Sequence, residues 1–329
     1  MEIKANIVQH QTSYLNNDFG ICIDDVTKND LHNSSFQAYA YELWVQSGGL
    51  LAIRGANLVN ISPVDFISIS NSFGKVEQEM QAARDDKSVD GYPILRIGNV
   101  KNDNGDSISQ FAQVPKLSCD ADIQYNPKTK RPVWHTDSTF RKKPPIGSVF
   151  HCRKAPSSGG ETLFADTRTA FEYLDEEKKH QLEKLEAICS LAHHDKKINT
   201  YSPDYPTLTP EQRLANPPMR VPLVLTHPVT GKRALYGVNS STCSIVPIGE
   251  KVCSEDLDYW DLEGCEDESV SILRDLLPHV TGPNFTVKWS WRAGDIVIWD
   301  NRCTIHAATG FDHDNEQREM WRVTLHDKE

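Results

Sequence analysis

Short strand-like segments constrain the fold of this 329-residue chain more than any other feature of its sequence. Beyond Tyr92 they recur throughout the chain, rich in β-branched and aromatic residues and bounded by Pro, Gly, Asn or Asp. The segments are PILRIGNV, IGSVFHCRK, ETLFADT, RVPLVLTHP, RALYGV, FTVKWSW and DIVIWDN. Such a series predicts a mainly β fold, either a sandwich or a barrel.

Helical patterns precede and interrupt these segments. The spacing of apolar residues predicts a helix over Ser34–Gln46, and LLAIRG after it is expected to be a buried strand. A second helix is expected over 62–74, with Ser62 as N-cap, Pro63 in the first turn and Gly74 at the end.

One long helix is predicted over 168–188, followed by a Pro-rich loop, so that an insertion at about 168–220 covers a site. No Gly/Ser-rich linker or internal repeat divides the chain, which indicates a single domain over 1–329.

Composition excludes several classes of function. The formal net charge of −11 disfavours nucleic-acid binding. The sequence contains no run of about 18 apolar residues of the kind that a membrane helix needs. The first residues lack the apolar core of a signal peptide, so a cytoplasmic protein is expected. The eight cysteines form no C-x-x-C pair and are expected to be reduced core thiols. The oligomeric state, including a homo-oligomer, is left open.

Metal chemistry is the function class that remains, because the chain has no G-x-G-x-x-G, P-loop or G-x-S-x-G motif. In WHTDSTF, His135 and Asp137 are two residues apart and share a face if that segment is extended. His306 follows the strand DIVIWDN and offers a third ligand. Two histidines and one carboxylate form the facial triad of non-haem Fe(II) oxygenases. The same three residues suit a zinc hydrolase or a non-catalytic metal-binding jelly roll, and an isolated H-x-D also arises by chance.

Two arginines supply the positive charge that an acidic co-substrate needs. Arg318 and Arg322 have an even spacing and would share a face of a strand.

A second histidine–aspartate triplet at 193–195 is interpreted as a solvated loop without function. Trp134, Phe140 and Trp299 are interpreted as core residues that wall the site.

Four ordered blocks resemble the taurine dioxygenase (TauD/TfdA) family of Fe(II)/2-oxoglutarate oxygenases. They are WHTDSTF, APSSGGETLFADTRTAFEYL, LTHPVTGKRALYGVN and GDIVIWDNRCTIHAA, followed by the two arginines, and GGLLAIRG with the helix after it resembles the opening of that family. The resemblance implies a double-stranded β-helix, or jelly roll, with a metal-binding core over 121–329 and flanking strands and helices over 1–120.

The resemblance also implies residue roles. His135, Asp137 and His306 match the iron ligands. Thr162 and Arg318 match the pair that holds the far carboxylate of 2-oxoglutarate, and Arg322 matches an arginine near its 1-carboxylate or near an anionic substrate. The implied cofactors are Fe(II), 2-oxoglutarate and O₂.

The expected reaction is abstraction of a hydrogen atom from an unactivated C–H bond, followed by hydroxylation. The alternatives with the same cofactors are desaturation and oxidative cyclisation in specialised metabolism, as in kainoid synthesis. A small anionic, amino-acid-derived substrate is expected, because bases lie near the proposed site in the sequence. The candidate substrate residues are Arg322, Asn239, Arg131 and Arg141.

Overall fold

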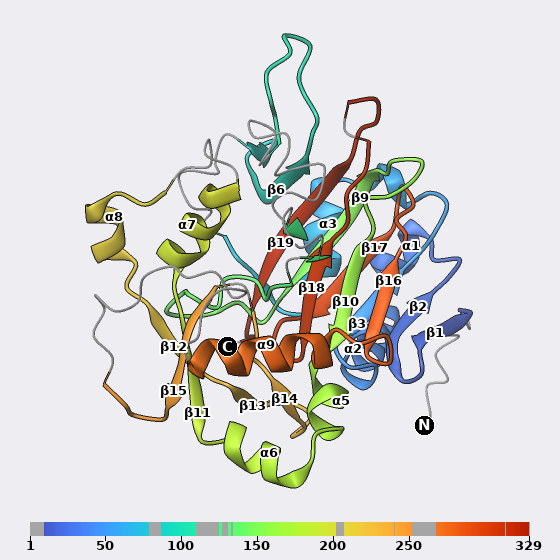
Figure 1. The fold of residues 1–329 in the computed structure, drawn as a ribbon. Coiled ribbons are helices and arrows are strands. Elements are labelled where there is room, and N and C mark those ends of the chain that lie inside the picture. Colours follow the sequence, from blue (N-terminus) through green and yellow to red (C-terminus); the bar gives the residue numbers. More distant parts are fainter. Residues whose placement is uncertain are drawn as a thin grey trace, which may run out of the picture.

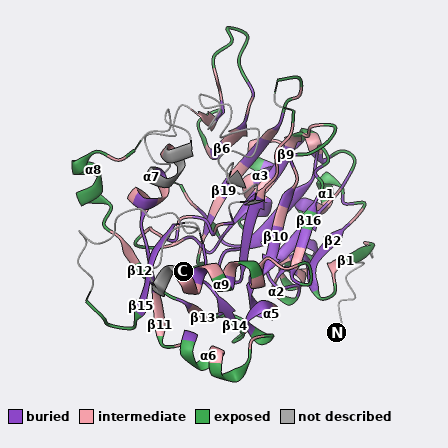
Figure 2. Ribbon diagram, in the orientation of Figure 1, coloured by how far each residue is buried: buried purple, intermediate pink, exposed green. Residues whose placement is uncertain are grey.

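The computed structural model describes residues 10–78, 87–109, 125–126, 131–132, 134–201, 207–239, 241–251, 268–312 and 314–328. Strands form the centre of the molecule and helices lie around them (Figure 1). Buried residues concentrate on these central strands, whereas α8 and β1 are largely exposed (Figure 2). None of the described helices is long and apolar enough to cross a membrane.

The largest sheet contains nine strands among the described residues, in the order β1-β2-β3-β17-β9-β19-β6-β5, with β4 paired to β19. It joins strands from the first hundred residues to strands from the middle and the end of the chain. Its members are β1 (Thr12–Asn16), β2 (Phe19–Ile23), β3 (Leu50–Ile53), β4 (Lys75–Val76), β5 (Ser88–Val89), β6 (Tyr92–Gly98), β9 (Gly147–Lys154), β17 (Ile296–Asp300) and β19 (Glu319–His326).

Smaller sheets complete the β structure. One has the order β16-β10-β18, one the order β12-β11-β15, and two are simple pairs. Their strands are β7 (Tyr125–Asn126), β8 (Arg131–Pro132), β10 (Thr162–Asp166), β11 (Leu185–Cys189), β12 (Met219–Pro222), β13 (Val224–Thr226), β14 (Arg233–Leu235), β15 (Thr242–Pro247), β16 (Thr286–Trp289) and β18 (Thr304–Ala308). The predicted mainly β fold class is confirmed.

The helices lie outside these sheets. They are α1 (Lys28–Leu31), α2 (Ser34–Gln46), the 3₁₀ turn η1 (Leu58–Asn60), α3 (Pro63–Ser70), α5 (Thr167–Glu172), α6 (Glu176–Leu182), α7 (Leu191–Tyr201), α8 (Pro210–Ala215) and α9 (Glu268–Val280). The predicted helix over Ser34–Gln46 is confirmed as α2.

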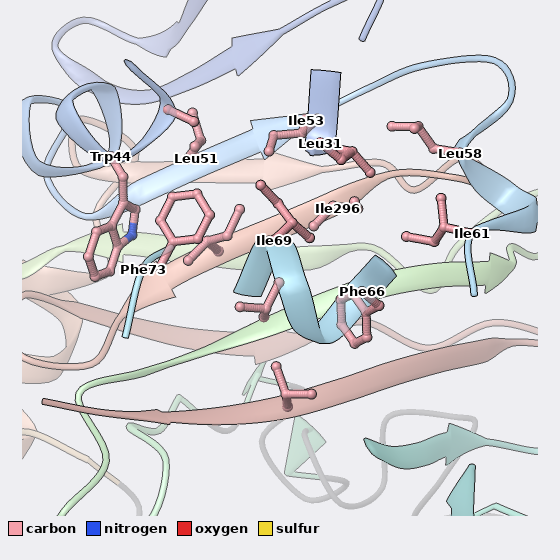
Figure 3. Packing of buried hydrophobic residues seen from close by; sticks show 14 of the residues in the cluster. Leu31, Trp44, Leu51, Ile53, Leu58, Ile61, Phe66, Ile69, Phe73 and Ile296 are labelled. Carbon is pink, nitrogen blue, oxygen red and sulfur yellow. The ribbon is translucent and has the colours of Figure 1, made fainter. Parts of the chain in front are cut away.

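Strand β17 shows how the large sheet comes to be buried on both faces. Successive side chains of a strand point to opposite faces. Ile296 and Ile298 belong to a cluster shared with α2 and α3, whereas Val297 and Trp299 belong to a cluster shared with β10 and β16. Figure 3 shows the first of these clusters around α3. The β16-β10-β18 sheet therefore packs on the face of the large sheet opposite the helices.

The same alternation orients two strands that matter for the site. On β9, Phe150 and Cys152 pack in the cluster between the sheets, and Val149 packs on the helix side. On β19, Met320 lies between the sheets and Trp321 on the helix side. Even-numbered residues of both strands thus face the smaller sheet.

The helix α3 begins as predicted and ends early. Ser62 accepts a hydrogen bond from the backbone of Asp65, and the Asp65 carboxylate accepts one from the backbone of Ser62, which forms a capping box. The helix ends at Ser70 and not near Gly74. Phe73 turns back into the core, where its ring lies 5.6 Å from that of Trp44.

The prediction of one long helix over 168–188 is wrong. The segment contains α5, α6 and β11. Asp175 accepts a hydrogen bond from the backbone N–H of Lys178 and so starts a new helix after α5. The last residues, Leu185–Cys189, pair with β12 and β15, and the final three of them are buried. Sheet pairing overrides the helical preference of the local sequence.

The interpretation of residues 193–195 as a solvated loop is also wrong. They lie in α7, and His193 and Asp195 are only 5% and 7% exposed. The Ser190 hydroxyl accepts a hydrogen bond from the backbone of His193 at the start of this helix, and α7 packs against β15. Packing against the sheet explains why these polar residues are buried.

The expected reduced state of the cysteines is confirmed for the described part of the chain. Five cysteines there are buried thiols: Cys22, Cys152, Cys189, Cys243 and Cys303. Cys119, Cys253 and Cys265 lie outside the described residues.

Candidate metal centre

The three predicted metal ligands meet at one point. His306 lies in the middle of β18, and His135 forms an isolated antiparallel bridge with it. Each of the two residues donates its backbone N–H to the carbonyl of the other over 2.9 Å. The bridge brings the two imidazoles side by side, with ring centroids 4.2 Å apart. Asp137 follows two residues after His135 and completes the cluster.

The geometry of these donors fits a divalent metal. The Oδ1 atom of Asp137 lies 3.9 Å from Nε2 of His135 and 3.8 Å from Nε2 of His306. Donors of first-row metal ions lie about 2.0–2.2 Å from the ion, so neighbouring donors are about 3 Å apart when the ion is bound. Small rotations of the side chains close this difference. Two neutral imidazoles and one carboxylate are the donor set of the facial triad.

The electrostatics keep Asp137 and His306 in their metal-binding protonation states. Burial alone would raise the pKa of the Asp137 carboxyl, but the charge of Arg322, the two imidazoles and the Ser148 hydroxyl together outweigh this effect. The pKa of Asp137 therefore lies well below its ordinary value. Burial lowers the pKa of His306 to about 3, and His135 and Arg322 act in the same direction. At neutral pH the cluster presents a carboxylate and a neutral imidazole.

Arg322 and Ser148 bind the carboxylate ligand from the large sheet. Arg322 in β19 places Nη2 3.0 Å from Oδ1 of Asp137, and Ser148 in β9 donates its hydroxyl to Oδ2 over 2.9 Å. Nη2 of Arg322 also donates to the Ser148 oxygen over 3.2 Å. Asp137 is thus held at both oxygens. Sequence reasoning missed Ser148, whose one signal is a small hydroxyl residue within the apolar strand IGSVFHC.

Aromatic rings line the side of the metal-ligand cluster that faces the core. The ring of Trp299 lies 4.8 Å from that of His306, and Phe164 stacks on His306 at 6.1 Å. Trp299 and Trp134 are buried in core clusters, and Phe140 packs against one of them. These contacts agree with the packing role expected for the three aromatic residues and exclude water from one side of the cluster.

Thr162 and Arg318 approach the same region from two sheets. Thr162 begins β10, which pairs with β18, and its hydroxyl accepts a hydrogen bond from Nε1 of Trp291 over 3.0 Å. Arg318 immediately precedes β19 and is 7% exposed. A Cβ atom on Gly160, two residues before Thr162, would lie 3.5 Å from Cδ of Arg318.

The backbone of Arg318 is held by the end of β6. Its N–H donates to Oδ1 of Asn99 over 2.8 Å. Gly98 has a φ of +143°, and a Cβ there would lie 1.9 Å from the Arg318 carbonyl oxygen. Glycine is therefore required at this close approach of two strands. The adjacent thiol of Cys152 is neutral, because burial raises its pKa to about 12.

Two of the other candidate substrate residues make contacts with residues outside the metal-ligand cluster. Asn239 accepts hydrogen bonds from the backbone N–H and hydroxyl of Ser241, both through its amide oxygen. Arg141 forms an ion pair with Glu77. The side chain of Arg131 lies outside the described residues. The structure therefore joins Arg322 to the metal-ligand cluster and places Asn239 and Arg141 in other contacts.

A second group of possible metal ligands, with His227, Asp300 and Cys303, is a structural hydrogen-bond cluster. Nδ1 of His227 accepts from two backbone N–H groups, so its Nε2 carries the proton and donates to Asp300 over 3.0 Å. Arg302 binds both oxygens of the Asp300 carboxylate. Both imidazole nitrogens and both carboxylate oxygens are occupied. The cluster fixes the turn that connects β17 to β18 and so supports the position of His306.

The fold and the cluster together define a class of protein: a jelly roll with a two-histidine, one-carboxylate metal centre between its sheets. The family model described as "Taurine catabolism dioxygenase TauD, TfdA family" matches residues 12–324. The chain belongs to this family. It is a non-haem dioxygenase that uses Fe(II), 2-oxoglutarate and O₂, as the family resemblance implied.

Curated relatives and a solved structure support this assignment. The 2,4-dichlorophenoxyacetate dioxygenase of Burkholderia sp. (strain RASC) is 27% identical over 306 residues, covering 87% of this chain and 92% of the relative. The sulfate ester dioxygenase of Pseudomonas putida is 33% identical over 204 residues, 58% of each chain. The crystal structure of AAD-2 with Mn(II) and N-oxalylglycine has a TM-score of 0.70 at 22% identity and covers 98% of this chain and 99% of that one. Its likeness confirms the predicted jelly-roll fold. The family assignment favours the oxygenase over the zinc-hydrolase and non-catalytic alternatives.

Proposed function

We propose that this enzyme hydroxylates a small anionic molecule, and that Arg322 recognises its anionic group or the 1-carboxylate of 2-oxoglutarate. The observation that carries this proposal is the position of Arg322, whose Nη2 lies 3.0 Å from the metal-binding oxygen of Asp137. A cation at that distance stabilises negative charge on a molecule bound beside the metal. Relatives named for phenoxyacetate, phenoxypropionate and sulfate ester substrates, all anionic, support the same class.

The remaining roles in the proposal are those that the family resemblance implies. His135, Asp137 and His306 hold the metal. Thr162 and Arg318 bind the far carboxylate of 2-oxoglutarate, one through a neutral hydroxyl and the other through a buried guanidinium. A charge-assisted hydrogen bond in a buried site is stronger than one in water, which suits a dicarboxylate co-substrate.

The protein contributes position and exclusion of water to the reaction. When bound, Fe(II) supplies oxidation of an unactivated C–H bond with O₂, while 2-oxoglutarate is converted to succinate and CO₂. Trp299 and Phe164 close the site on the side of the core. Ser148 and Arg322 keep the carboxylate ligand ionised and oriented. The C–H bond that lies nearest the metal when the anionic group meets Arg322 is the one that reacts.

An anaerobic optical titration tests the cofactor roles. Fe(II) and then 2-oxoglutarate are added to the wild-type protein and to His306→Ala, Arg318→Ala and His180→Ala. His180 is an exposed residue of α6 and serves as the control. We expect a weak visible charge-transfer band that is lost in His306→Ala, needs more 2-oxoglutarate in Arg318→Ala, and is unchanged in the control. Metal binding without such a band would contradict the proposed site.

Succinate release tests the substrate class. The panel contains taurine, aryloxyacetates, sulfate esters, amino acids, N-alkyl glutamates and neutral analogues, and product analysis separates hydroxylation from desaturation and cyclisation. We expect coupled turnover with anionic compounds only, and a KM for the substrate raised by about tenfold or more in Arg322→Ala. Arg220→Ala is the matched control, because Arg220 is paired with Glu186 on the surface. Turnover with neutral compounds alone would refute the anionic class.

A further inference from the structure

A buried tryptophan, Trp291, forms a hydrogen bond with the hydroxyl group of Thr162, which belongs to the proposed co-substrate site. Trp291 follows β16 and is 7% exposed, and its indole N–H donates to the Thr162 oxygen over 3.0 Å. Thr162 is itself 5% exposed and is fixed by its place in β10, opposite Trp289 on one side and Ala308 on the other. The sheet therefore holds Thr162, and Trp291 is buried beside it just after β16.

The hydrogen bond from Trp291 determines whether the Thr162 hydroxyl donates or accepts when it binds another partner. A threonine hydroxyl has one hydrogen to donate and two lone pairs to accept with, whereas an indole N–H can only donate. Trp291 occupies a lone pair of Thr162 and leaves its hydrogen for another partner. Within the described residues the structure records no acceptor for that hydrogen. A carboxylate is an acceptor only, so the hydroxyl is prepared to donate to one.

The neighbouring Trp289 shows that this contact is specific. It lies two residues earlier and is similarly buried, at 5% exposure. Its own Nε1 atom is buried and finds no hydrogen-bond partner in the described part of the chain. Arg54 stacks over its ring at 4.4 Å. Two tryptophans of similar burial therefore differ in one respect that can be tested, namely whether the indole N–H binds Thr162.

We infer that Trp291 is a positioning residue for 2-oxoglutarate, because it holds the Thr162 hydroxyl as a donor toward the far carboxylate of the co-substrate. This inference rests on the proposed function, which gives Thr162 that contact. Phe150 lies 6.1 Å from the Trp291 ring and fixes it from β9. In this inference Trp291 acts on the co-substrate through its hydrogen bond to Thr162.

The test compares the affinity for N-oxalylglycine of Mn(II)-loaded variants by calorimetry, so that no turnover is needed. Trp291→Phe removes the N–H and keeps an aromatic ring, and Trp289→Phe is the matched control. We expect Trp291→Phe to weaken N-oxalylglycine binding about fivefold to tenfold, and Trp289→Phe less than about twofold. Affinity for Mn(II) alone is expected to be unchanged in both variants.

Thr162→Val and the double variant complete the cycle. Thr162→Val is expected to weaken N-oxalylglycine binding at least as much as Trp291→Phe, and the double variant no more than Thr162→Val alone. An unchanged affinity in Thr162→Val would refute the proposed role of Thr162, and the inference with it. A loss in Thr162→Val without one in Trp291→Phe, equal losses in the two tryptophan variants, or additive losses in the double variant would overturn the inference alone.

A second measurement does not depend on the folding of Trp291→Phe. In protein with ¹⁵N-labelled tryptophan, the indole N–H resonance of Trp291 is followed in the wild type and in the near-isosteric Thr162→Val. We expect its hydrogen exchange to become faster in Thr162→Val, while that of Trp289 stays the same. Equal exchange of the Trp291 N–H in both proteins would mean that it does not bind Thr162, which overturns the inference.

Discussion

Replacement of His151 by glutamine is expected to make the protein less sensitive to acid. His151 is fully buried in β9, on the helix side of the large sheet, with its ring 5.6 Å from Phe66 and 5.7 Å from Trp321. Its Nε2 donates to the Leu58 carbonyl over 3.0 Å, and its Nδ1 has no partner in the described part of the chain. A proton added at Nδ1 would be an uncompensated charge in the core.

The direction and size of the effect follow from the pKa of this histidine. Burial, with a smaller contribution from Arg153, lowers the pKa of His151 in the folded protein from the ordinary 6.5 to about 3. Above pH 6.5 the residue is neutral in both states and contributes nothing. Below that pH the unfolded chain binds a proton that the folded chain does not, so stability falls until the pH reaches the folded value. At pH 5 the linkage relation gives a loss of about 2 kcal/mol.

Urea unfolding of the metal-free protein at pH 8, 6.5 and 5 measures this loss. Other groups also titrate over this range, so the informative quantity is the difference between the wild type and His151→Gln. We expect the wild type to lose about 2 kcal/mol more than the variant between pH 8 and pH 5. His180→Gln changes an exposed histidine and should follow the wild type. Parallel pH profiles for the wild type and His151→Gln would refute the reasoning.

Three further predictions concern the metal centre and its supports. Ser148→Ala removes the hydrogen bond to Oδ2 of Asp137, and titration with Mn(II) should show affinity reduced about tenfold. Gly98→Ala places a Cβ against the Arg318 carbonyl, and urea unfolding should show a loss of about 2 kcal/mol or more; Gly105→Ala, with a φ of +85° in open space, should lose less. Mn(II) at about one hundred times its Kd should stabilise the wild type by about 2.7 kcal/mol, and a chelator should reverse this; a melting temperature independent of Mn(II) would contradict a preformed site.

The strands of this fold were predictable because the pattern of apolar residues that indicates each strand lies within the strand itself. The segment DIVIWDN is apolar at successive positions, which a strand buried on both faces requires, and β17 is such a strand. The segment 168–188 was not predictable by the same means. Its charged, helix-favouring residues form α6, but Leu185–Cys189 gains more by pairing with β12 and β15 than by extending the helix. Those partners are remote in the sequence, so no local pattern shows the pairing.

The residues of the metal centre also fall into those that the sequence predicted and those that it did not. The ligands His135 and Asp137 were visible as an H-x-D pair, because a short spacing is a local signal. Ser148 and Trp291 were not, because each acts through one hydrogen bond to a residue of another element. A serine in an apolar strand and a tryptophan after a strand are common in any β protein. Only the three-dimensional register shows which atom each one reaches.

The two sheets contribute different chemistry to the site, and the carboxylate ligand joins them. The smaller sheet carries His306 on β18 and Thr162 on β10, both of which offer uncharged groups. The large sheet brings the positive charge, because the alternation that turns Met320 toward the smaller sheet also turns Arg322 that way. Asp137 belongs to neither sheet; it binds Ser148 and Arg322 of the large sheet and lies 3.8 Å from Nε2 of His306 in the smaller one. A substitution that alters sheet-to-sheet packing should therefore change the charge balance at the metal before it changes the spacing of the two histidines, since these are fixed by their own backbone bridge.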